Sequence, residues 1–436
     1  MILYELFKQQ ANLLPNKIAV VDGETQLTYR GLLQSVDEYS EWLRNQSFAG
    51  TVAGFQTDWK SVVRFLASAK LNSCVCPLPP GTMPEDAMGL VRLLTDSAEP
   101  LPYLLLGSSG TTGTPKLISL SQECKVNRAV QLARMVHLKP SDVVLVRTPL
   151  HLSLGIRMLF TGLLHGCTLR LVKHYSPEAW LAEAKQCTLV AGTPLQLRHL
   201  TSDVGAMRLV LSASMPKVQD NGELAAVLAT QGVEYLDTYG ATEVAFAAYG
   251  PAIDERMIPA PGVSLDMGGL DGELLVKSNV MFDGYFNRHE LTAEKVNAHG
   301  YFSTGDSCVL GRDPIRDGGQ HWVQIIGRLG DRIKVGGVTV WPEEVEAALR
   351  RAGYTQDLAV VGTTDDDLGE VVCVCVEHQL IKEGHGMQLG DSLLLINLQR
   401  ACLAQGLPDA ALPRRLLLVS HIPRTASGKV IRGALK

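Results

Sequence analysis

The stretch LLLGSSGTTGTPKLISLS, residues 104–121, restricts the fold of this chain more than any other feature. An apolar run enters a segment of Gly, Ser and Thr that ends at Pro115 and Lys116. Glycine permits sharp turns, and successive backbone N–H groups in such a turn form a nest that binds anions. The hydroxyls and the lysine ammonium add further donors. The segment therefore predicts a polyphosphate-binding loop, and the alternative is a solvated loop of low complexity.

This loop differs from the phosphate loop of ordinary kinases and NTPases. Their G-x-x-x-x-G-K-[ST] pattern places the lysine after a glycine and before a hydroxyl residue. Here Lys116 follows Pro115 and precedes Leu117. The difference disfavours a Walker-type NTPase.

Composition and charge limit the classes of partner. A chain of 436 residues predicts two to three domains, and a net charge of −5 favours neither nucleic acid nor an anionic membrane. No apolar run approaches the ~18 residues that a spanning helix needs. Glu5 and Lys8 interrupt the first ten residues, which argues against a signal peptide. We predict a cytoplasmic protein that binds no nucleic acid and spans no membrane.

The nine cysteines predict buried free thiols. Cys74-x-Cys76 and Cys373-x-Cys375 lie in strand-like runs, where a spacing of two places each pair on one face. Further ligands at metal-binding spacing do not accompany them. Buried free thiols fit a reducing compartment.

Strand-like runs alternate with helical patterns along the chain, which predicts an α/β fold with helices covering sheets. Helical spacing marks residues 3–14, 29–45 and 341–353. Strand-like runs occupy residues 208–214, 233–240, 273–278, 358–364 and 370–378. A Gly- and Asp-rich region precedes a compact C-terminal part. We place a domain boundary there, which gives domains of residues 1–329 and 330–436.

Five further motifs accompany the loop: YGATE (239–243), GELLVKSNVMFDGYF (272–286), YFSTGD (301–306), IGRLGDRIKVGG (326–337) and PRTASGK (423–429). Together with SSGTTGTPK, in this order and spacing, they resemble the adenylate-forming superfamily: acyl-CoA and aryl-CoA ligases, nonribosomal-peptide adenylation domains and firefly luciferase. The resemblance covers nearly the whole chain. It implies a large N-terminal domain of packed sheets and helices with a small mobile α+β C-terminal lid domain.

The resemblance also implies a two-step reaction with ATP and Mg²⁺ as cofactors. A carboxylate attacks the α-phosphate of ATP, which gives an acyl-adenylate and pyrophosphate. A thiol then attacks the acyl carbon and releases AMP. The acceptor implied is CoA or the phosphopantetheine of a separate carrier protein, and the other substrate is a small carboxylic acid.

The same resemblance implies a nucleotide site, in which cations and oriented donors offset the repulsion between carboxylate and phosphate. Thr242 would contact the α-phosphate, and Glu243 would hold Mg²⁺, a hard ion that prefers carboxylate oxygen. Asp306 would bind the ribose hydroxyls with help from Arg328. The remaining residues would hold the β- and γ-phosphates or border the adenine: Ser108, Ser109, Gly110, Thr111, Thr112, Gly113, Lys116, Ser212, Ala213, Ser214, Tyr239 and Gly240.

Two further roles follow from the resemblance. Lys429 on the lid would bridge the carboxylate and the α-phosphate and then leave for the second step. His151, in TPLHLSLGIR, would border the carboxylate and the acyl tunnel; its alternative role is that of a satisfied core histidine. The pocket wall would comprise small, mostly uncharged residues: Val190, Ala191, Gly192, Thr193, Pro194, Met215 and Ala241.

The likeness is incomplete at two places. The family usually carries Asp or Lys two residues after the arginine of GRLGDRIK as the hinge of the lid, whereas this chain has Gly330 there and Asp331 next. Glycine permits wide backbone angles, so Gly330 still fits a hinge. The segment between residues 77–80 and the phosphate loop is only about 25 residues long, shorter than in many relatives, so the chain resembles the compact members.

LGDSL at residues 389–393 resembles a phosphopantetheine attachment site. A carrier needs its own bundle of helices, which the lid does not provide. We expect instead a helix start with Asp391 or Ser392 as its cap. The chain therefore carries no acceptor of its own.

The charge of the predicted pocket residues indicates which class of carboxylic acid the enzyme takes as substrate. Amino-acid-activating relatives hold the substrate ammonium with an aspartate, but the matching residues 148–157 contain no acid. A buried unpaired ammonium is costly, which disfavours an α-amino acid and leaves an aryl acid, favoured, or a fatty acid. Two alternatives stay open: transfer of the acyl group to an amine or its oxidation, and a non-catalytic AMP-binding regulator.

Overall fold

The computed structural model describes residues 2–45, 50–108, 116–173, 176–197, 199–200, 203–213, 220–269, 271–312, 321–354, 356–377, 389–425 and 429–436. Its chain forms two compact units. The first consists of residues 1–213, 224–265 and 276–302, and the second of residues 214–223, 266–275 and 303–436. The predicted domain boundary between residues 329 and 330 remains a prediction.

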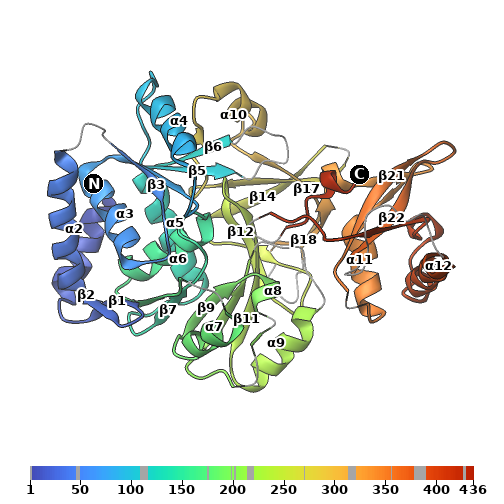
Figure 1. The fold of residues 1–436 in the computed structure, drawn as a ribbon, viewed down its shortest axis with the longest axis horizontal. Coiled ribbons are helices and arrows are strands. Elements are labelled where there is room, and N and C mark those ends of the chain that lie inside the picture. Colours follow the sequence, from blue (N-terminus) through green and yellow to red (C-terminus); the bar gives the residue numbers. More distant parts are fainter. Residues whose placement is uncertain are drawn as a thin grey trace. The chain divides into compact units, whose positions relative to one another are not determined.

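The largest sheet lies in the first unit and has nine strands in the order β13-β12-β11-β10-β9-β7-β8-β1-β2 (Figure 1). Its interior strands β8, β7, β9, β10 and β11 run parallel. Such strands are buried on both faces and consist of apolar runs, as LVLS of β10 shows. The strand bounds are β1 Ile18–Asp22, β2 Thr25–Thr28, β7 Val143–Val146, β8 Thr168–Leu171, β9 Leu189–Gly192, β10 Leu209–Ser212, β11 Glu234–Ala241, β12 Ala245–Pro251 and β13 Ile258–Pro259.

A five-stranded sheet of the first unit, in the order β16-β6-β5-β4-β3, carries the ends of the phosphate loop. Its strands are β3 Gly50–Gly54, β4 Cys74–Leu78, β5 Leu104–Ser108, β6 Lys116–Leu120 and β16 Gly284–Tyr285. A four-stranded sheet follows the order β14-β15-β17-β18, with β14 Val263–Gly268, β15 Glu273–Ser278, β17 Phe302–Arg312 and β18 His321–Arg328.

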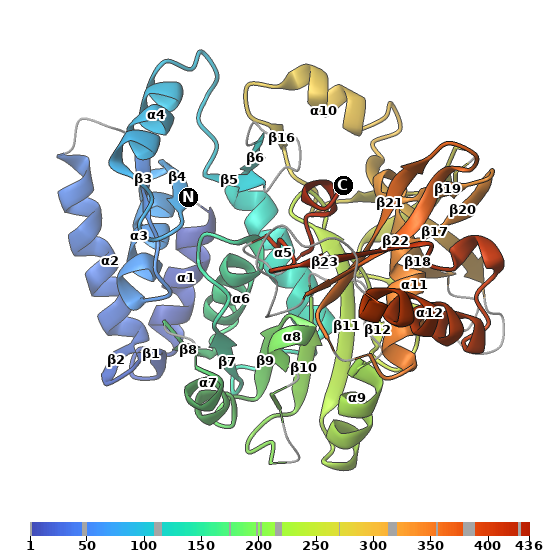
Figure 2. The same cartoon turned by 45° about the vertical axis from the view of Figure 1, so that its right-hand side comes forward.

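Helices of the first unit pack between and around its sheets. α6 packs against β7 and β8, α3 packs against β3 and β4, and α5 lies against α6 in both views (Figures 1 and 2). Side-chain caps start four of them: Thr28, Asp58, Ser121 and Ser176 accept from the backbone N–H three residues on, at the starts of α2, α3, α5 and α7. The helices are α1 Ile2–Leu13, α2 Tyr29–Arg44, α3 Trp59–Leu71, α4 Pro84–Thr95, α5 Gln122–Met135, α6 Ser153–Leu164, α7 Pro177–Ala184, α8 Pro194–Leu197 and α10 His289–Lys295, together with α9 Asp220–Thr230, whose residues from Leu224 on belong to this unit.

The second unit contains a five-stranded sheet, β20-β19-β22-β21 with β23 beside β22, against which α11 and α12 pack (Figure 2). Pro342 begins α11, its first turn is acidic and its last turn is basic, as the helix dipole favours. The elements are β19 Ile333–Val335, β20 Val338–Val340, α11 Pro342–Arg351, β21 Leu358–Asp365, β22 Gly369–Glu377, α12 Leu389–Ala404 and β23 Arg415–Val419; the 3₁₀ turns are Leu329–Asp331, Asp409–Ala411 and Arg432–Ala434.

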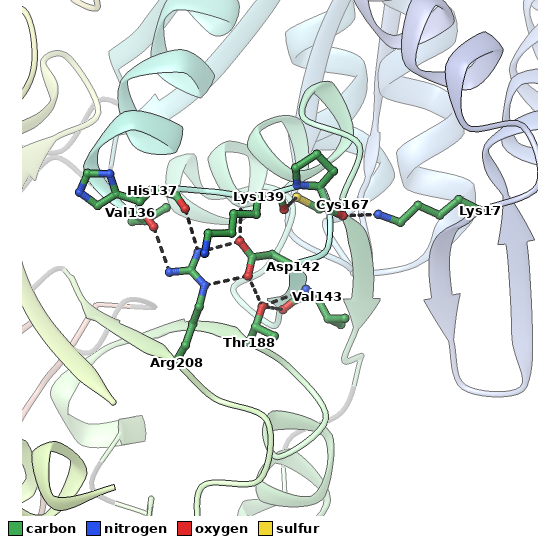
Figure 3. A network of polar contacts seen from close by, with 10 residues as sticks. Lys17, Val136, His137, Lys139, Asp142, Val143, Cys167, Thr188 and Arg208 are labelled. Atoms are coloured by element: carbon green, nitrogen blue, oxygen red, sulfur yellow. Dashed lines mark hydrogen bonds and ion pairs between the residues drawn. The ribbon is translucent and has the colours of Figure 1, made fainter. Parts of the chain in front are cut away.

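An ionic network fixes the entry to β7 in the first unit (Figure 3). Asp142 is buried and accepts hydrogen bonds from Arg208 Nε at 2.8 Å and Nη2 at 2.6 Å, and from Thr188 Oγ1 at 2.7 Å. Arg208 also donates to the backbone oxygen of Val136. Burial acts to raise the pKa of Asp142, but these hydrogen bonds outweigh it and lower that pKa. The carboxylate is therefore ionised and paired at neutral pH.

The local predictions hold for the main elements. Helices α1, α2 and α11 and strands β10, β11, β15, β21 and β22 occupy the segments predicted for them. All nine cysteines are free and buried, as predicted. The predicted helix cap at Asp391 or Ser392 is wrong, because α12 begins at Leu389 and includes both residues in its first turn. None of the helices in the described ranges combines the length and the apolar character that a membrane crossing requires.

Candidate active site

The phosphate loop connects β5 to β6, which pair with each other. These strands are antiparallel and place Ser108 directly opposite Lys116. The loop can therefore start and end on one rigid strand pair, which the apolar runs on both sides of it produce. Five of the loop residues predicted to bind phosphate, Ser109, Gly110, Thr111, Thr112 and Gly113, and the side chain of Ser108 lie outside the described part of the structure.

Lys116 is held next to an aromatic ring at the first residue of β6. Its Nζ lies 5.7 Å from the centroid of the Tyr285 ring, within the range of a cation–π contact. Tyr285 is brought there by β16, which pairs with β6 so that Tyr285 faces Ile118. A strand about 170 residues further along the chain therefore positions the lysine that ends the loop.

Tyr285 connects the lysine to the predicted magnesium ligand. Its hydroxyl donates to Glu243 Oε1 over 2.9 Å. Burial and the neighbouring Glu243 carboxylate raise the pKa of Tyr285, so the phenol keeps its proton and acts as a donor at neutral pH. Lys116, Tyr285 and Glu243 thus form one chain of contacts inside the first unit.

A tight turn between β11 and β12 presents Thr242 and Glu243. In the hairpin, Ala241 pairs with Ala245, which leaves three residues in the turn. Gly240 is required there, because a Cβ at this position would lie 1.8 Å from the Ala245 carbonyl oxygen.

Two donors fix the backbone of this turn. The Phe282 N–H donates to the Glu243 carbonyl over 2.6 Å, and Arg128 Nη2 donates to the same oxygen over 3.1 Å. Glu243 is therefore held at both ends: Phe282 and Arg128 hold its backbone carbonyl, and Tyr285 holds its side-chain carboxylate. This arrangement can keep one carboxylate oxygen free for a cation.

The predicted adenine and acid pockets converge at the carboxyl ends of parallel strands. Ser212 at the end of β10 faces Gly192 at the end of β9, and Ala213 N donates to the Gly192 carbonyl over 3.0 Å. Thr238 Oγ1 of β11 donates to the Ser212 carbonyl over 2.8 Å. Ligands of open α/β sheets bind outside such carboxyl ends. The three strands therefore bring Gly192, Ser212 and Ala213 together. Thr238, which contacts Ser212, directly precedes Tyr239 in the sequence.

Other predicted pocket residues have different positions. Val190 is fully buried in the hydrophobic cluster that contains Trp180 and Leu197, so its side chain belongs to the core. Ala191 is also buried, and Thr193 N donates to the Gln196 side chain over 3.1 Å. Ser214 and Met215 lie outside the described residues.

His151 lies just before α6. A Cβ on Gly155 would be 2.2 Å from the Thr148 carbonyl oxygen, so only glycine lets the first turn of α6 approach this segment. Burial lowers the pKa of His151, although a backbone hydrogen bond with Phe55 opposes the shift. The imidazole is therefore neutral at physiological pH and available as a hydrogen-bonding group.

The second unit brings together three other predicted residues. Asp306 on β17 faces Arg328 on β18, and their side chains form an ion pair with 3.2 Å between Oδ1 and Nη1. Lys429 lies within electrostatic range of both. Burial and Arg328 lower the pKa of Lys429, against the opposing effect of Asp306 and Asp331.

Gly330 lies in the 3₁₀ turn Leu329–Asp331. A Cβ there would meet nothing within 4 Å, so packing does not require glycine at this position in this conformation. Its neighbour Asp331 forms an ion pair with Arg432 at 3.4 Å. The hinge role of Gly330 remains a prediction.

The comparisons with known proteins identify the family. The AMP-binding enzyme family model matches residues 95–286, and the model of the AMP-binding enzyme C-terminal domain matches residues 344–429. The chain is 24% identical to the 2-succinylbenzoate–CoA ligase of Geobacillus sp. (strain WCH70), over 98% of this chain and 96% of that protein. It is 30% identical to the indoleacetate–CoA ligase of Aromatoleum aromaticum, over 76% of this chain and 66% of that protein. The chain belongs to the AMP-binding, adenylate-forming enzyme family.

Solved structures share its fold. ATP-bound MatB from Rhodopseudomonas palustris has a TM-score of 0.81 at 20% identity, covering 99% of this chain and 98% of that one. MenE from Bacillus subtilis in complex with the acyl-adenylate intermediate OSB-AMP has a TM-score of 0.81 at 19% identity, covering 99% and 97%. The predicted α/β fold with a large N-terminal and a smaller C-terminal domain is confirmed. The family model and the relatives named as CoA ligases confirm the predicted reaction class, an AMP-forming acid–thiol ligase.

The residues present fit the ATP and Mg²⁺ that this family uses. Mg²⁺ is commonly held by one or two carboxylates together with substrate phosphates and water, rather than by an all-protein cage. No group of three or more acidic, histidine or cysteine side chains able to hold a metal occurs among the described residues. The single carboxylate of Glu243, near Lys116, is what such a phosphate-shared site requires.

Tyr285 contacts two residues of the candidate site and was not among the residues predicted from the sequence. It lies within the motif GELLVKSNVMFDGYF, but its role depends on the pairing of β16 with β6, which the residues alone do not reveal. The motif itself was the available signal, since a polar aromatic residue near the end of a family motif is a candidate for a site contact.

Proposed function

We propose that this enzyme activates a small carboxylic acid with ATP and passes the acyl group to the thiol of CoA. The observation that carries the proposal is the contact chain Lys116–Tyr285–Glu243, which joins the end of the phosphate loop to a carboxylate suited to magnesium. The predicted pocket residues are small and mostly uncharged, which suits an aryl or a fatty acid, and the compact chain favours the aryl acid. The phosphopantetheine of a carrier protein is the alternative acceptor.

In the first step, a carboxylate oxygen attacks the α-phosphorus and pyrophosphate leaves. Lys116 holds the outer phosphates, and Thr242 donates to the α-phosphate from the β11–β12 turn. Glu243 holds Mg²⁺, which when bound neutralises phosphate charge. The Tyr285 hydroxyl keeps the Glu243 carboxylate oriented, since it donates to one oxygen and leaves the other available.

The nucleoside is recognised by the second group of residues. Asp306 accepts from the ribose hydroxyls while Arg328 holds that carboxylate in place. Tyr239 stacks near the adenine, with Ser212 and Ala213 at the edge of its pocket. Lys429 supplies a positive charge between the carboxylate and the α-phosphate as the new bond forms.

In the second step, the thiol attacks the acyl carbon, the acyl–oxygen bond breaks and AMP leaves with the acid's oxygen on its phosphate. The neutral His151 borders the acyl group. Lys429 leaves the site before this step, with Gly330 as the pivot of the lid. The relatives named as CoA ligases favour CoA over a carrier protein as the thiol.

A pyrophosphate-release assay tests the proposal. The enzyme is given ATP, Mg²⁺ and a panel of aryl, fatty and amino acids, with and without CoA. We expect release with aryl or fatty acids that needs no CoA to begin and turns over faster with it. Robust release with an α-amino acid alone, or none with any acid, would contradict the proposed substrate class.

A further inference from the structure

Three cationic side chains are buried next to each other behind the β11–β12 turn. Lys125 and Arg128 lie on α5 and Arg157 lies on α6, and the two helices pack together. The relative exposures of the three residues are 1%, 0% and 5%. Arg128 lowers the pKa of Lys125 and of Arg157 by charge repulsion, and Arg157 lowers that of Lys125.

These cations have more donors than partners. Arg128 Nε donates to the Val280 carbonyl over 2.8 Å, and its Nη2 to the Glu243 carbonyl, but its Nη1 has no partner among the described residues. Lys125 Nζ and Arg157 Nε are likewise buried without an acceptor in the described part of the chain. Aromatic rings cover the charges, because Lys125 Nζ faces Phe160 at 5.7 Å.

The first unit supplies little negative charge to this cluster. The groups that favour the charged form of Arg128 are the Cys124 side chain, which also forms a hydrogen bond with it, and the carboxylates of Asp283 and Glu243. Asp283 accepts from the hydroxyl and the backbone N–H of Ser121, and Glu243 accepts from Tyr285. The segments of this unit outside the described residues, 1, 46–49, 109–115, 174–175, 198 and 201–202, contain no Asp or Glu in their sequence.

Burying three neighbouring cations without an anion destabilises the folded state. The effective penalty for burying an ion is several kcal/mol, and repulsion among like charges adds to it. Lys125 can lose its proton, and burial with the charge of Arg128 lowers its pKa, but arginine does not deprotonate readily. Asp283 and Glu243 act as counter-charges of Arg128, whereas no Asp or Glu of the described residues acts on Arg157, so the Arg157 guanidinium is the one that needs a counter-ion from elsewhere.

The cluster borders the site of the proposed reaction. Arg128 donates directly to the backbone of Glu243, and the Arg157 guanidinium lies 4.0 Å from the centroid of the Phe246 ring, three residues after Glu243. A molecule whose reacting carboxylate lies at Thr242 and Glu243 could therefore place its far end at these cations.

We propose that the acid substrate carries a second anionic group, a carboxylate or a sulfonate, which binds to Lys125, Arg128 and Arg157. This inference rests on the proposed function and narrows its substrate class. The second group supplies the missing counter-charge and fills the unpaired donors. An uncharged acyl chain leaves those donors unsatisfied, which is the situation in which a polar site rejects an analogue most strongly.

Matched pairs of acids test the inference by ATP–pyrophosphate exchange. Each pair compares a diacid with its monoacid of equal size: adipic with hexanoic acid, terephthalic with 4-methylbenzoic acid, and 3-sulfopropanoic with pentanoic acid. We expect at least one anion-tailed acid to exceed its partner by 100-fold or more in kcat/KM. Preference for the monoacid in every pair overturns the inference and leaves the proposed function standing, whereas no exchange with any acid overturns both.

Arg157→Met tests the cluster itself. Methionine retains contact with Phe246 but removes the charge, so the diacid-to-monoacid ratio should fall at least 30-fold. Arg134→Met is the matched control, because Arg134 is an exposed residue of the same helix as Arg128 and should leave the ratio unchanged. A ratio that stays the same in Arg157→Met contradicts the inference.

Thermal unfolding gives a readout independent of substrate. If the three cations are kept for a ligand, removing one of them relieves repulsion, and Arg157→Met should melt at the same temperature as the original chain or higher. Lys125→Met should behave in the same way. A marked fall in melting temperature in both variants, with no change in acid preference, would assign the cluster a structural role and overturn the proposal.

Discussion

Replacing Tyr285 by phenylalanine removes one hydroxyl and leaves the ring, and with it the contact to Lys116, in place. The hydroxyl donates to Glu243 Oε1 over 2.9 Å. A hydrogen bond to a charged group contributes about 1.5–3 kcal/mol, and we take the lower end because the Glu243 side chain is only half-buried and water can replace the donor. About 1.4 kcal/mol is tenfold in rate, so adenylation should fall about tenfold.

The assay measures ATP–pyrophosphate exchange as a function of Mg²⁺ concentration. We expect the half-saturating Mg²⁺ concentration to rise in Tyr285→Phe, because the metal ligand has lost its orienting contact. Tyr39→Phe is the control, since Tyr39 stacks on Trp42 in α2. If Tyr285→Phe exchanges pyrophosphate at the original rate and with the same Mg²⁺ dependence, the Lys116–Tyr285–Glu243 chain does not position the metal ligand.

The remaining predictions concern the lid residues and the ionic network. Lys429→Ala should slow adenylation at least 100-fold, about 3 kcal/mol, and nearly spare thioester formation from pre-made acyl-adenylate; equal loss in both refutes the two-step role. Because burial lowers its pKa and the cation is the active form, adenylation should decline as pH rises through that lowered pKa, and Lys429→Arg should move the decline to higher pH. Gly330→Pro should slow one half-reaction about tenfold with little change in melting temperature; if only Asp331→Pro does so, the pivot is Asp331. Arg208→Met should lower the free energy of unfolding in urea by about 2–3 kcal/mol, because it leaves the buried Asp142 carboxylate unpaired; a loss below about 0.5 kcal/mol would show that Asp142 finds another partner.

The sequence predicts those parts of the fold that local patterns determine. The apolar run LVLS forms the interior strand β10, and LAVVGTT forms β21, an edge strand whose first five residues are buried. The cysteine pairs are free and buried because their spacing places them on strands with no further ligands. The motifs predict the family, since their order and spacing reflect a shared arrangement of site residues.

Other features depend on contacts between distant segments. The LGDSL segment contains two good capping residues, but α12 starts earlier, at Leu389, so local cap preference did not decide its start. The local sequence gives no sign that three cations, Lys125, Arg128 and Arg157, are buried. Their burial depends on the packing of α5 on α6. The role of Tyr285 likewise depends on the pairing of β16 with β6.

The most direct test of the reaction follows the oxygen atoms of the acid. The enzyme is incubated with ATP, Mg²⁺, CoA and a substrate acid labelled with ¹⁸O in its carboxylate, and the AMP formed is analysed by mass spectrometry. Attack of the carboxylate on the α-phosphorus, followed by thiol attack on the acyl carbon, predicts one ¹⁸O atom in each AMP. Unlabelled AMP, or ADP together with labelled inorganic phosphate, would contradict an acyl-adenylate intermediate.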